Sequence, residues 1–287
     1  MVFVMFLIGL LAVVFVAALI AFVPDNVLPL VLVLAGGLLF AQFFFSDKIA
    51  SFAMGAHEVT PEQAPQLHAT IDRLCALADM PKPRVAISDT DMPNAFATGR
   101  NPKNAVVCVT TGLMRRLDEQ ELEGVLAHEL SHVAHRDVMV ITIASFLGIL
   151  SGLIARMAFW FGIGGNRGRN NQNDGIPIEL IIILISAVTY AVSFLLIRGL
   201  SRYRELAADR SGAILTGNPS GLASALVKIS GDMGRIPTGD LRKAEPFNAF
   251  YFAPAFTKGS MMALMSTHPT TEKRLEQLGR IAQQLGR

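Results

Sequence analysis

The residues of this sequence best suited to chemistry are His128, Glu129 and His132, which form the pattern His-Glu-x-x-His. On a helix, side chains four residues apart point the same way, so two neutral imidazoles can bind one zinc ion at about 2.0 to 2.1 Å. Glu129 lies about 100° further around the helix, where its carboxylate can act as a general base on the attacking water in peptide hydrolysis. Two histidines on a solvated helix face are the alternative interpretation.

A catalytic zinc ion usually takes three protein ligands, so the sequence should supply a third. His135 and Asp137 are close by, but the continuation HExxHxxGxxH is absent, because the chain reads HELSHVAHRDVM and then turns apolar. The later segment SRYRELAADR places Glu205 and Asp209 one helical turn apart, on the same predicted side of the membrane as His128. Each carboxylate is a candidate, and an ion pair with a neighbouring arginine is the alternative for each.

The helix that carries these histidines is predicted to begin after Asp118, because Glu121 three residues later completes a capping box. Its apolar stripe consists of Leu122, Leu126, Leu130 and Val133.

The segment before this helix has the character of a small α+β domain. A helix is expected in VTPEQAPQLHATIDRLCALADM, with Thr60 as its N-cap and Pro61 in its first turn. Three short runs that are partly β-branched and bounded by turn residues predict a small sheet: PRVAIS, NAFAT and NAVVCVTT.

Composition places much of the chain in a membrane. Of its 287 residues, 52% are hydrophobic and only 17% are charged, which is too apolar for an ordinary soluble protein of this size. Apolar runs of roughly 20 residues are long enough to cross a bilayer. The sequence contains four such predicted spans, at about 2–23, 27–45, 138–160 and 176–199.

These spans divide the chain into alternating membrane and protease segments. The expected fold is mainly α, with four transmembrane helices and a cytoplasmic α+β domain that carries the HExxH helix. Its expected parts are a transmembrane hairpin at 1–46, the first half of the protease domain at 47–137, a second hairpin at 138–200, and the second half of the protease domain at 201–287.

Basic residues indicate which side of the membrane the protease halves occupy. Most of those near the span ends flank segments 46–137 and 201–287, namely Lys48, Arg136, Arg198, Arg202 and Arg204. The connection at 24–26 carries only Asp25, whereas Arg167 and Arg169 lie in the other connecting loop and count against the assignment. The positive-inside rule therefore favours a cytoplasmic protease domain.

Cysteine usage and net charge limit the partners. Cys75 and Cys108 form no CxxC pair and are interpreted as free thiols in a reducing compartment, with a disulfide between them as the alternative. The formal net charge of +2 gives no basic footprint, so nucleic acid is not an expected partner.

The ordered motifs resemble one protein family. Two N-terminal spans, HELSHVAHRD, two further spans, SRYRELAADR and a later STHPTTEKR together resemble the HtpX family of heat-shock membrane proteases, relatives of the CAAX prenyl-processing zinc proteases. The resemblance implies a zinc protease domain of the gluzincin type, in an enzyme of the bacterial inner membrane that degrades misfolded membrane proteins on the cytoplasmic side. It also implies one zinc ion per subunit, held by His128, His132 and Glu205, with Asp209 as a supporting residue.

Two further residues receive roles from the same resemblance. Asn94 lies in a segment that resembles an edge strand binding the substrate backbone, although an asparagine in a turn after Pro93 is the alternative. His268 precedes Pro269, the expected first residue of the C-terminal helix, and by resemblance approaches the active site to stabilise the oxyanion. As a histidine that simply precedes a helix, His268 would need no role.

A non-enzymatic membrane protein is the competing class. Such a protein would be a scaffold, or a zinc-binding transporter whose HExxH is structural. A transporter should carry ionisable residues well inside its spans, and the central parts of the four predicted spans are almost without them. The sequence therefore favours a zinc endopeptidase.

Overall fold

The computed structural model describes residues 2–22, 28–164, 178–233 and 268–286. The chain divides into two compact units, Met1–Gln42 with Val140–Leu200 and Phe43–Met139 with Ser201–Arg287. Two long helices, α7 (Asp137–Gly164) and α8 (Ile178–Thr216), contribute residues to both units. Each unit has a buried core of its own.

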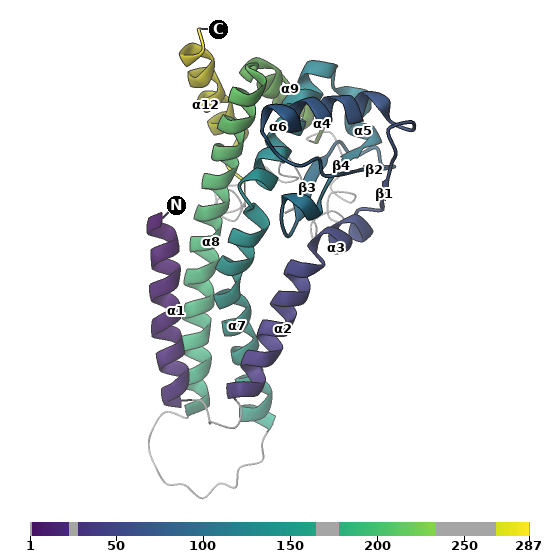
Figure 1. The fold of residues 1–287 in the computed structure, drawn as a ribbon. Coiled ribbons are helices and arrows are strands. Elements are labelled where there is room, and N and C mark those ends of the chain that lie inside the picture. The colour runs from purple at the N-terminus through teal and green to yellow at the C-terminus, as the bar shows by residue number, and fades with distance from the viewer. Residues whose placement is uncertain (1, 23–27, 165–177, 234–267, 287) are drawn as a thin grey trace, which may run out of the picture. The chain divides into compact units, whose positions relative to one another are not determined.

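The first unit is built from apolar helices, seen as long ribbons in Figure 1. Besides its parts of α7 and α8, it contains α1 (Val2–Phe22) and most of α2 (Leu28–Phe44). Phe15 of α1, Ala35 of α2 and Leu150 of α7 belong to one buried cluster. Each of the four runs predicted to span the membrane therefore contains a helix.

Length and apolarity qualify α7 and α8 as candidate membrane spans. Helix α2 qualifies as a third only together with α3 (Ser46–Ala53), and the chain bends by 68° at the break between them. In the described part of α1, the apolar stretch Phe6–Ala18 is shorter. An integral membrane protein is thus supported, whereas the number of four spans remains a prediction.

Helix α8 is longer than the predicted span. The apolar run ends near residue 199, but the helix continues for 39 residues from Ile178 to Thr216. No proline interrupts it, and the polar continuation is rich in the helix formers Leu, Arg, Glu and Ala. The sequence boundary therefore marked a change of polarity and not an end of the helix, so Glu205 and Asp209 lie on the same helix as the apolar run.

The second unit contains a four-stranded sheet of order β1-β2-β4-β3. Strands β2 (Arg84–Ser88) and β4 (Ala105–Thr110) pair in parallel, and β3 (Ala95–Gly99) pairs antiparallel with β4. The three predicted strands are confirmed. Strand β1 (Ala56–Glu58) was not predicted, because its three residues are too few for an alternating pattern to be recognised. Strand β3 is left at one edge of the sheet.

Helices pack around this sheet. In Figure 1, α6 (Glu119–Ala134) and α4 (Pro65–Leu77) lie near the strands, and α6 contacts β3 directly. Helix α9 (Pro219–Met233) packs between α6 and α12 (Thr271–Gln284). The shorter helices are α3, the 3-10 helix η1 (Pro102–Asn104) and α5 (Thr111–Arg116). The core between these elements is apolar and includes Leu126, Leu130, Leu222, Leu226 and Leu278.

Two predicted helix starts were wrong. Helix α4 begins at Pro65, not after Thr60, because a proline inside the helix would remove a hydrogen bond and clash with the preceding turn, whereas it fits the first position. Helix α12 begins at Thr271, two residues after Pro269. Its N-cap is Thr270, whose hydroxyl accepts a hydrogen bond from the Lys273 backbone N–H.

Candidate metal centre

Helix α6 turns two imidazoles toward each other. The predicted capping box is confirmed, because Asp118 and Glu121 exchange side-chain to backbone hydrogen bonds at the start of the helix. His128 and His132 lie one turn apart near its end, with Nε2 atoms 3.1 Å apart. Both side chains are enclosed, and His128 is only 1% exposed.

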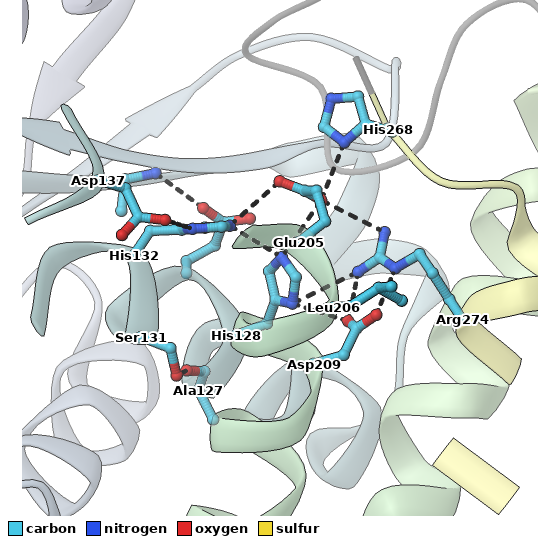
Figure 2. A network of polar contacts seen from close by, with 12 residues as sticks. Ala127, His128, Ser131, His132, Asp137, Glu205, Leu206, Asp209, His268 and Arg274 are labelled. Atoms are coloured by element: carbon cyan, nitrogen blue, oxygen red, sulfur yellow. Dashed lines mark hydrogen bonds and ion pairs between the residues drawn. The ribbon is translucent and has the colours of Figure 1, made fainter. Parts of the chain in front are cut away.

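Helix α8 brings a carboxylate to the same point. Glu205 Oε1 lies 3.4 Å from His132 Nε2, and Glu205 Oε2 lies 3.8 Å from His128 Nε2. One donor atom from each residue lies within 4.8 Å of the others. Figure 2 shows the three side chains directed toward one another. Asp209 is not in this group, so among the described residues the geometry selects Glu205 from the two candidate carboxylates.

The close approach of α8 to α6 depends on Gly212. A Cβ atom at this position would lie 2.9 Å from the His128 backbone nitrogen, inside the closest contact that real Cβ atoms make. Helix α8 can therefore lie against the histidine turn only because residue 212 has no side chain.

The three donor groups fit a metal ion. Two ligands of one tetrahedral ion with bonds of about 2.0 to 2.1 Å lie roughly 3.3 Å apart, close to the separation of the two Nε2 atoms. Each Nδ1 atom faces a carboxylate oxygen, which favours the tautomer that leaves Nε2 as an acceptor. Two acceptor nitrogens that face each other repel unless a metal ion or a proton lies between them. Imidazole and carboxylate donors are also the set that zinc accepts.

His128 is held by groups from two other helices. Its Nδ1 atom lies 2.9 Å from Asp209 Oδ1. Arg274 of α12 donates to both oxygens of Asp209, at 2.8 and 2.6 Å, in the two-pronged arrangement typical of strong pairs. Both charged side chains are inaccessible to solvent, with Asp209 0% and Arg274 1% exposed. Figure 2 shows the Arg274 guanidinium between the carboxylates of Asp209 and Glu205.

His132 is held in a parallel way by Asp137 and Arg204. Its Nδ1 atom lies 2.7 Å from Asp137 Oδ2, and Asp137 forms an ion pair with Arg204. Arg204 also donates to the backbone carbonyl of His135, at 3.3 Å, near the end of α6. From the sequence, Asp137 was only a possible ligand. The roles of Arg204 and Arg274 were not predicted, because nothing in the sequence marks either arginine as buried.

Glu129 lies between the histidines and the edge strand. Its Oε2 atom accepts a hydrogen bond of 3.0 Å from the Ala97 backbone N–H in β3. Burial raises the pKa of Glu129 to about 7, and the nearby Glu205 carboxylate also raises it, whereas His132 opposes the shift. This carboxyl group is therefore poised to exchange a proton near neutral pH.

The two histidines differ in their affinity for a proton. Burial lowers the pKa of His128 to about 4, although Asp209 acts in the opposite direction. Burial would also lower the pKa of His132, but the hydrogen bond to Glu205 and its charge outweigh burial and raise it. In the protein without metal, His128 is therefore neutral at pH values at which His132 can carry a proton.

His268 lies at the opposite side of Glu205 from the histidine pair. Its Nδ1 atom is 2.9 Å from Glu205 Oε2, and the residue is 7% exposed. Because the two nitrogens of an imidazole lie on different edges of the ring, this contact directs Nε2 away from Glu205. The structure thus places His268 at the site but in contact with an expected ligand.

Asn94 is placed at the entry to β3. It is fully buried, and its backbone carbonyl accepts a hydrogen bond from the Thr110 backbone N–H. Its own N–H donates to the Thr110 hydroxyl oxygen. Asn94 therefore fixes one end of the edge strand on β4.

Two comparisons place the sequence among known proteins. The sequence model of peptidase family M48 matches residues 61–282. Protease HtpX homolog 1 of Streptomyces coelicolor is 60% identical over 284 residues, 98% of this chain and 91% of that protein. Protease HtpX homolog of Moorella thermoacetica is 55% identical over 257 residues, 89% of this chain and 85% of that protein. Protease HtpX homolog 2 of Methanosarcina mazei is 50% identical over 285 residues, 99% and 95% respectively.

A solved structure shares the fold. The chain aligns with S. mikatae Ste24p with a TM-score of 0.58 and 17% sequence identity. The alignment covers 94% of this chain and 62% of the Ste24p chain. At this level of identity the likeness concerns the fold alone.

Proposed function

Because the chain belongs to peptidase family M48, we propose that it is a zinc-dependent endopeptidase that hydrolyses misfolded or membrane polypeptides at the cytoplasmic face of the bacterial inner membrane. The resemblance to HtpX proteases and the expectation of a metalloprotease are confirmed by relatives at 60, 55 and 50% identity. The observation that supports the proposal most directly is the convergence of His128, His132 and Glu205 beside Glu129 and β3.

His128, His132 and Glu205 would hold one zinc ion per subunit. A bound zinc ion supplies Lewis-acid polarisation of the scissile carbonyl and of the attacking water. Asp209 and Asp137 fix the ring orientation of the two histidines through Nδ1 and raise the basicity of Nε2. Supporting carboxylates of this kind are common beside histidine ligands of zinc.

Glu129 would move the proton. Its carboxylate removes a proton from the water that attacks the scissile carbonyl, and it then delivers the proton to the departing amine nitrogen. A pKa raised to about 7 by burial suits both steps, because the group must accept a proton and release it at similar pH. His268 would donate a hydrogen bond from Nε2 to the developing oxyanion.

The edge of β3 with which no described strand pairs would bind the substrate backbone. Residues of β3 alternate in direction, and Ala97 uses its N–H for Glu129, so Ala95, Ala97 and Gly99 present backbone groups away from β4. An extended peptide that adds to this edge would lie beside Glu129. Asn94 anchors the start of the strand and is proposed as a substrate-binding residue through this position.

Two substitutions test the proposal. Glu129→Gln should keep one zinc ion per chain by elemental analysis and lose casein hydrolysis by ~10²- to 10⁴-fold, because only the general base is removed. Glu205→Ala should lose zinc and activity together, because two protein ligands remain. If Glu205→Ala retains full zinc and activity, the third ligand is misassigned.

Thiol labelling tests the cytoplasmic face. Cys75 and Cys108 are buried, and burial raises their pKa values to about 11 and about 12, so they should react poorly on either side. A reporter is therefore needed at an exposed position such as Arg280. The variant Arg280→Cys should resist membrane-impermeant thiol reagents in intact cells and react after lysis. Labelling in intact cells would place the domain on the outer side.

A further inference from the structure

One helix of the second unit has an apolar face that the described residues leave largely exposed. Helix α3 exposes Phe45 at its N-cap, Ile49 and Phe52, with exposed fractions of 42, 50 and 90%. These residues are spaced i, i+4 and i+7 and therefore share one side of the helix. A phenylalanine that is 90% exposed to water is unfavourable, so this face needs an apolar partner.

The opposite face of α3 is packed on the sheet. Ala50 is 0% exposed and belongs to a buried cluster with Phe96 of β3 and Cys108 of β4. Asp47 forms an ion pair with Arg84 of β2. One side of α3 therefore carries an ion pair and packs on the sheet. Because charged groups are costly in the centre of a bilayer, α3 cannot be surrounded by hydrocarbon on all sides.

Basic side chains lie at the border of the apolar face. The Lys48 ammonium lies 5.8 Å from the centre of the Phe45 ring, and the Arg100 guanidinium lies 4.1 Å from the centre of the Phe44 ring. Aromatic and basic side chains in close proximity are the combination found at lipid headgroups. In addition, α3 follows directly on the apolar helix α2, so the chain arrives at α3 from a candidate span.

We infer that α3 is an interfacial helix whose Phe45, Ile49 and Phe52 insert into the boundary between lipid headgroups and acyl chains. Lys48 and Arg100 would contact lipid phosphates. Through Ala50 and Phe96, the same helix supports β3, the strand whose Ala97 N–H binds Glu129. One consequence of this inference rests on the proposed function. The substrate-binding edge of β3 would be held beside the bilayer, where a membrane-anchored polypeptide emerges.

The insertion is tested by tryptophan fluorescence in phospholipid vesicles. The sequence contains one tryptophan, Trp160, so Trp160→Phe provides a background without tryptophan. In that background Phe52→Trp is the probe, and Ile49→Trp is a second probe in case the first is poorly expressed. Leu77→Trp is the matched control, because Leu77 is an exposed apolar residue of the same unit, on α4, at 60% exposure.

The expected result for the F52W probe is blue-shifted emission, strong quenching by lipids brominated near the carbonyl end of the acyl chain, and weak quenching by aqueous iodide. The L77W control should show the reverse. Quenching of the F52W probe by iodide to the same extent as the control would overturn the inference. So would stronger quenching by lipids brominated near the terminal methyl, which would make α3 part of a span. Shielding from both quenchers would also overturn it, in favour of a protein contact. None of these readouts depends on peptidase activity, so their failure is distinct from a failure of the proposed function.

Discussion

The two histidines that face the candidate metal position are each held by a carboxylate and an arginine, but the groups come from different places in the chain. His128 depends on Asp209 of α8 and Arg274 of α12, which are far away in sequence. His132 depends on Asp137, only five residues further along, at the start of α7. One support is therefore tertiary, and the other is largely local.

The supports also differ in their enclosure. Asp209 and Arg274 are 0 and 1% exposed and make two hydrogen bonds with each other, whereas Asp137 and Arg204 are 8 and 6% exposed. A buried pair is costly to break, because the remaining charge has neither water nor a partner. We expect the His128 support to govern both folding and metal binding, and the His132 support to govern mainly metal binding.

The largest expected effect is that of Arg274→Met. The substitution leaves the Asp209 carboxylate buried without its main partner, and breaking a buried pair in this way typically costs about 3 to 5 kcal/mol. The free energy of unfolding in detergent, measured with denaturant, should fall accordingly. Arg280→Met on the same helix is the control, because Arg280 makes only an exposed ion pair with Glu276 and should change stability little.

The double variant Asp209→Asn/Arg274→Met sharpens this test. It removes the isolated charge, so it should be more stable than Arg274→Met alone, although the support of His128 is weakened. If Arg274→Met is no less stable than Arg204→Met, the two supports are equivalent in folding and the comparison fails.

The next effect is that of Asp137→Ala on metal affinity. Loss of a carboxylate that orients a histidine ligand typically lowers metal affinity by about 10- to 100-fold. Chelator competition should show this loss for zinc, while the free energy of unfolding changes less than in Arg274→Met, because Arg204 keeps its hydrogen bond to the His135 carbonyl. Unchanged zinc affinity would show that Asp137 does not orient His132.

The features that depend on local helix geometry were predicted from the sequence more completely than the contacts between distant segments. The capping box at Asp118 and Glu121 and the facing of His128 and His132 depend on helix geometry, which spacing alone specifies. Contact between Asp137 and His132 requires the chain to turn at Arg136, which adopts a positive φ of 56° that its residue type does not suggest.

The tertiary support was only partly predictable. Asp209 was expected from the motif that resembles HtpX proteases, and the structure places it against His128. Arg274 was missed, because an arginine in a polar helix is ordinarily exposed, and only packing shows that this one is buried. The start of α4 was misplaced, because the preference of Pro65 for the first helical position outweighed the capping preference of Thr60.

A smaller effect should appear in the pH dependence of zinc binding. Because the pKa of His132 is raised and that of His128 is lowered to about 4, zinc must displace a proton from His132 but not from His128 in mildly acidic solution. Below the pKa of His132, affinity should therefore fall by about tenfold per pH unit, the slope for one proton. The variant Glu129→Gln is the suitable background, because Glu129 itself titrates near pH 7. A change of zinc affinity with pH that corresponds to two protons would show that zinc displaces a proton from each histidine. The two supports would then not give the histidines different pKa values.

The smallest effect is expected for His135→Ala. His135 stands three residues after His132 and was the nearest alternative ligand in the sequence, but its side chain is exposed. The hydrogen bonds described for His135 involve its backbone: the N–H donates to the Ser131 carbonyl, and the carbonyl accepts from Arg204. Alanine keeps that carbonyl and suits the end of a helix, so the support of His132 should survive. Zinc content by elemental analysis and affinity by chelator competition should match those of the unmodified protein, in contrast to Asp137→Ala. A loss of zinc in His135→Ala comparable to that in Asp137→Ala would mean that the imidazole of His135 takes part in binding and that the His132 support contains more than the carboxylate and the arginine.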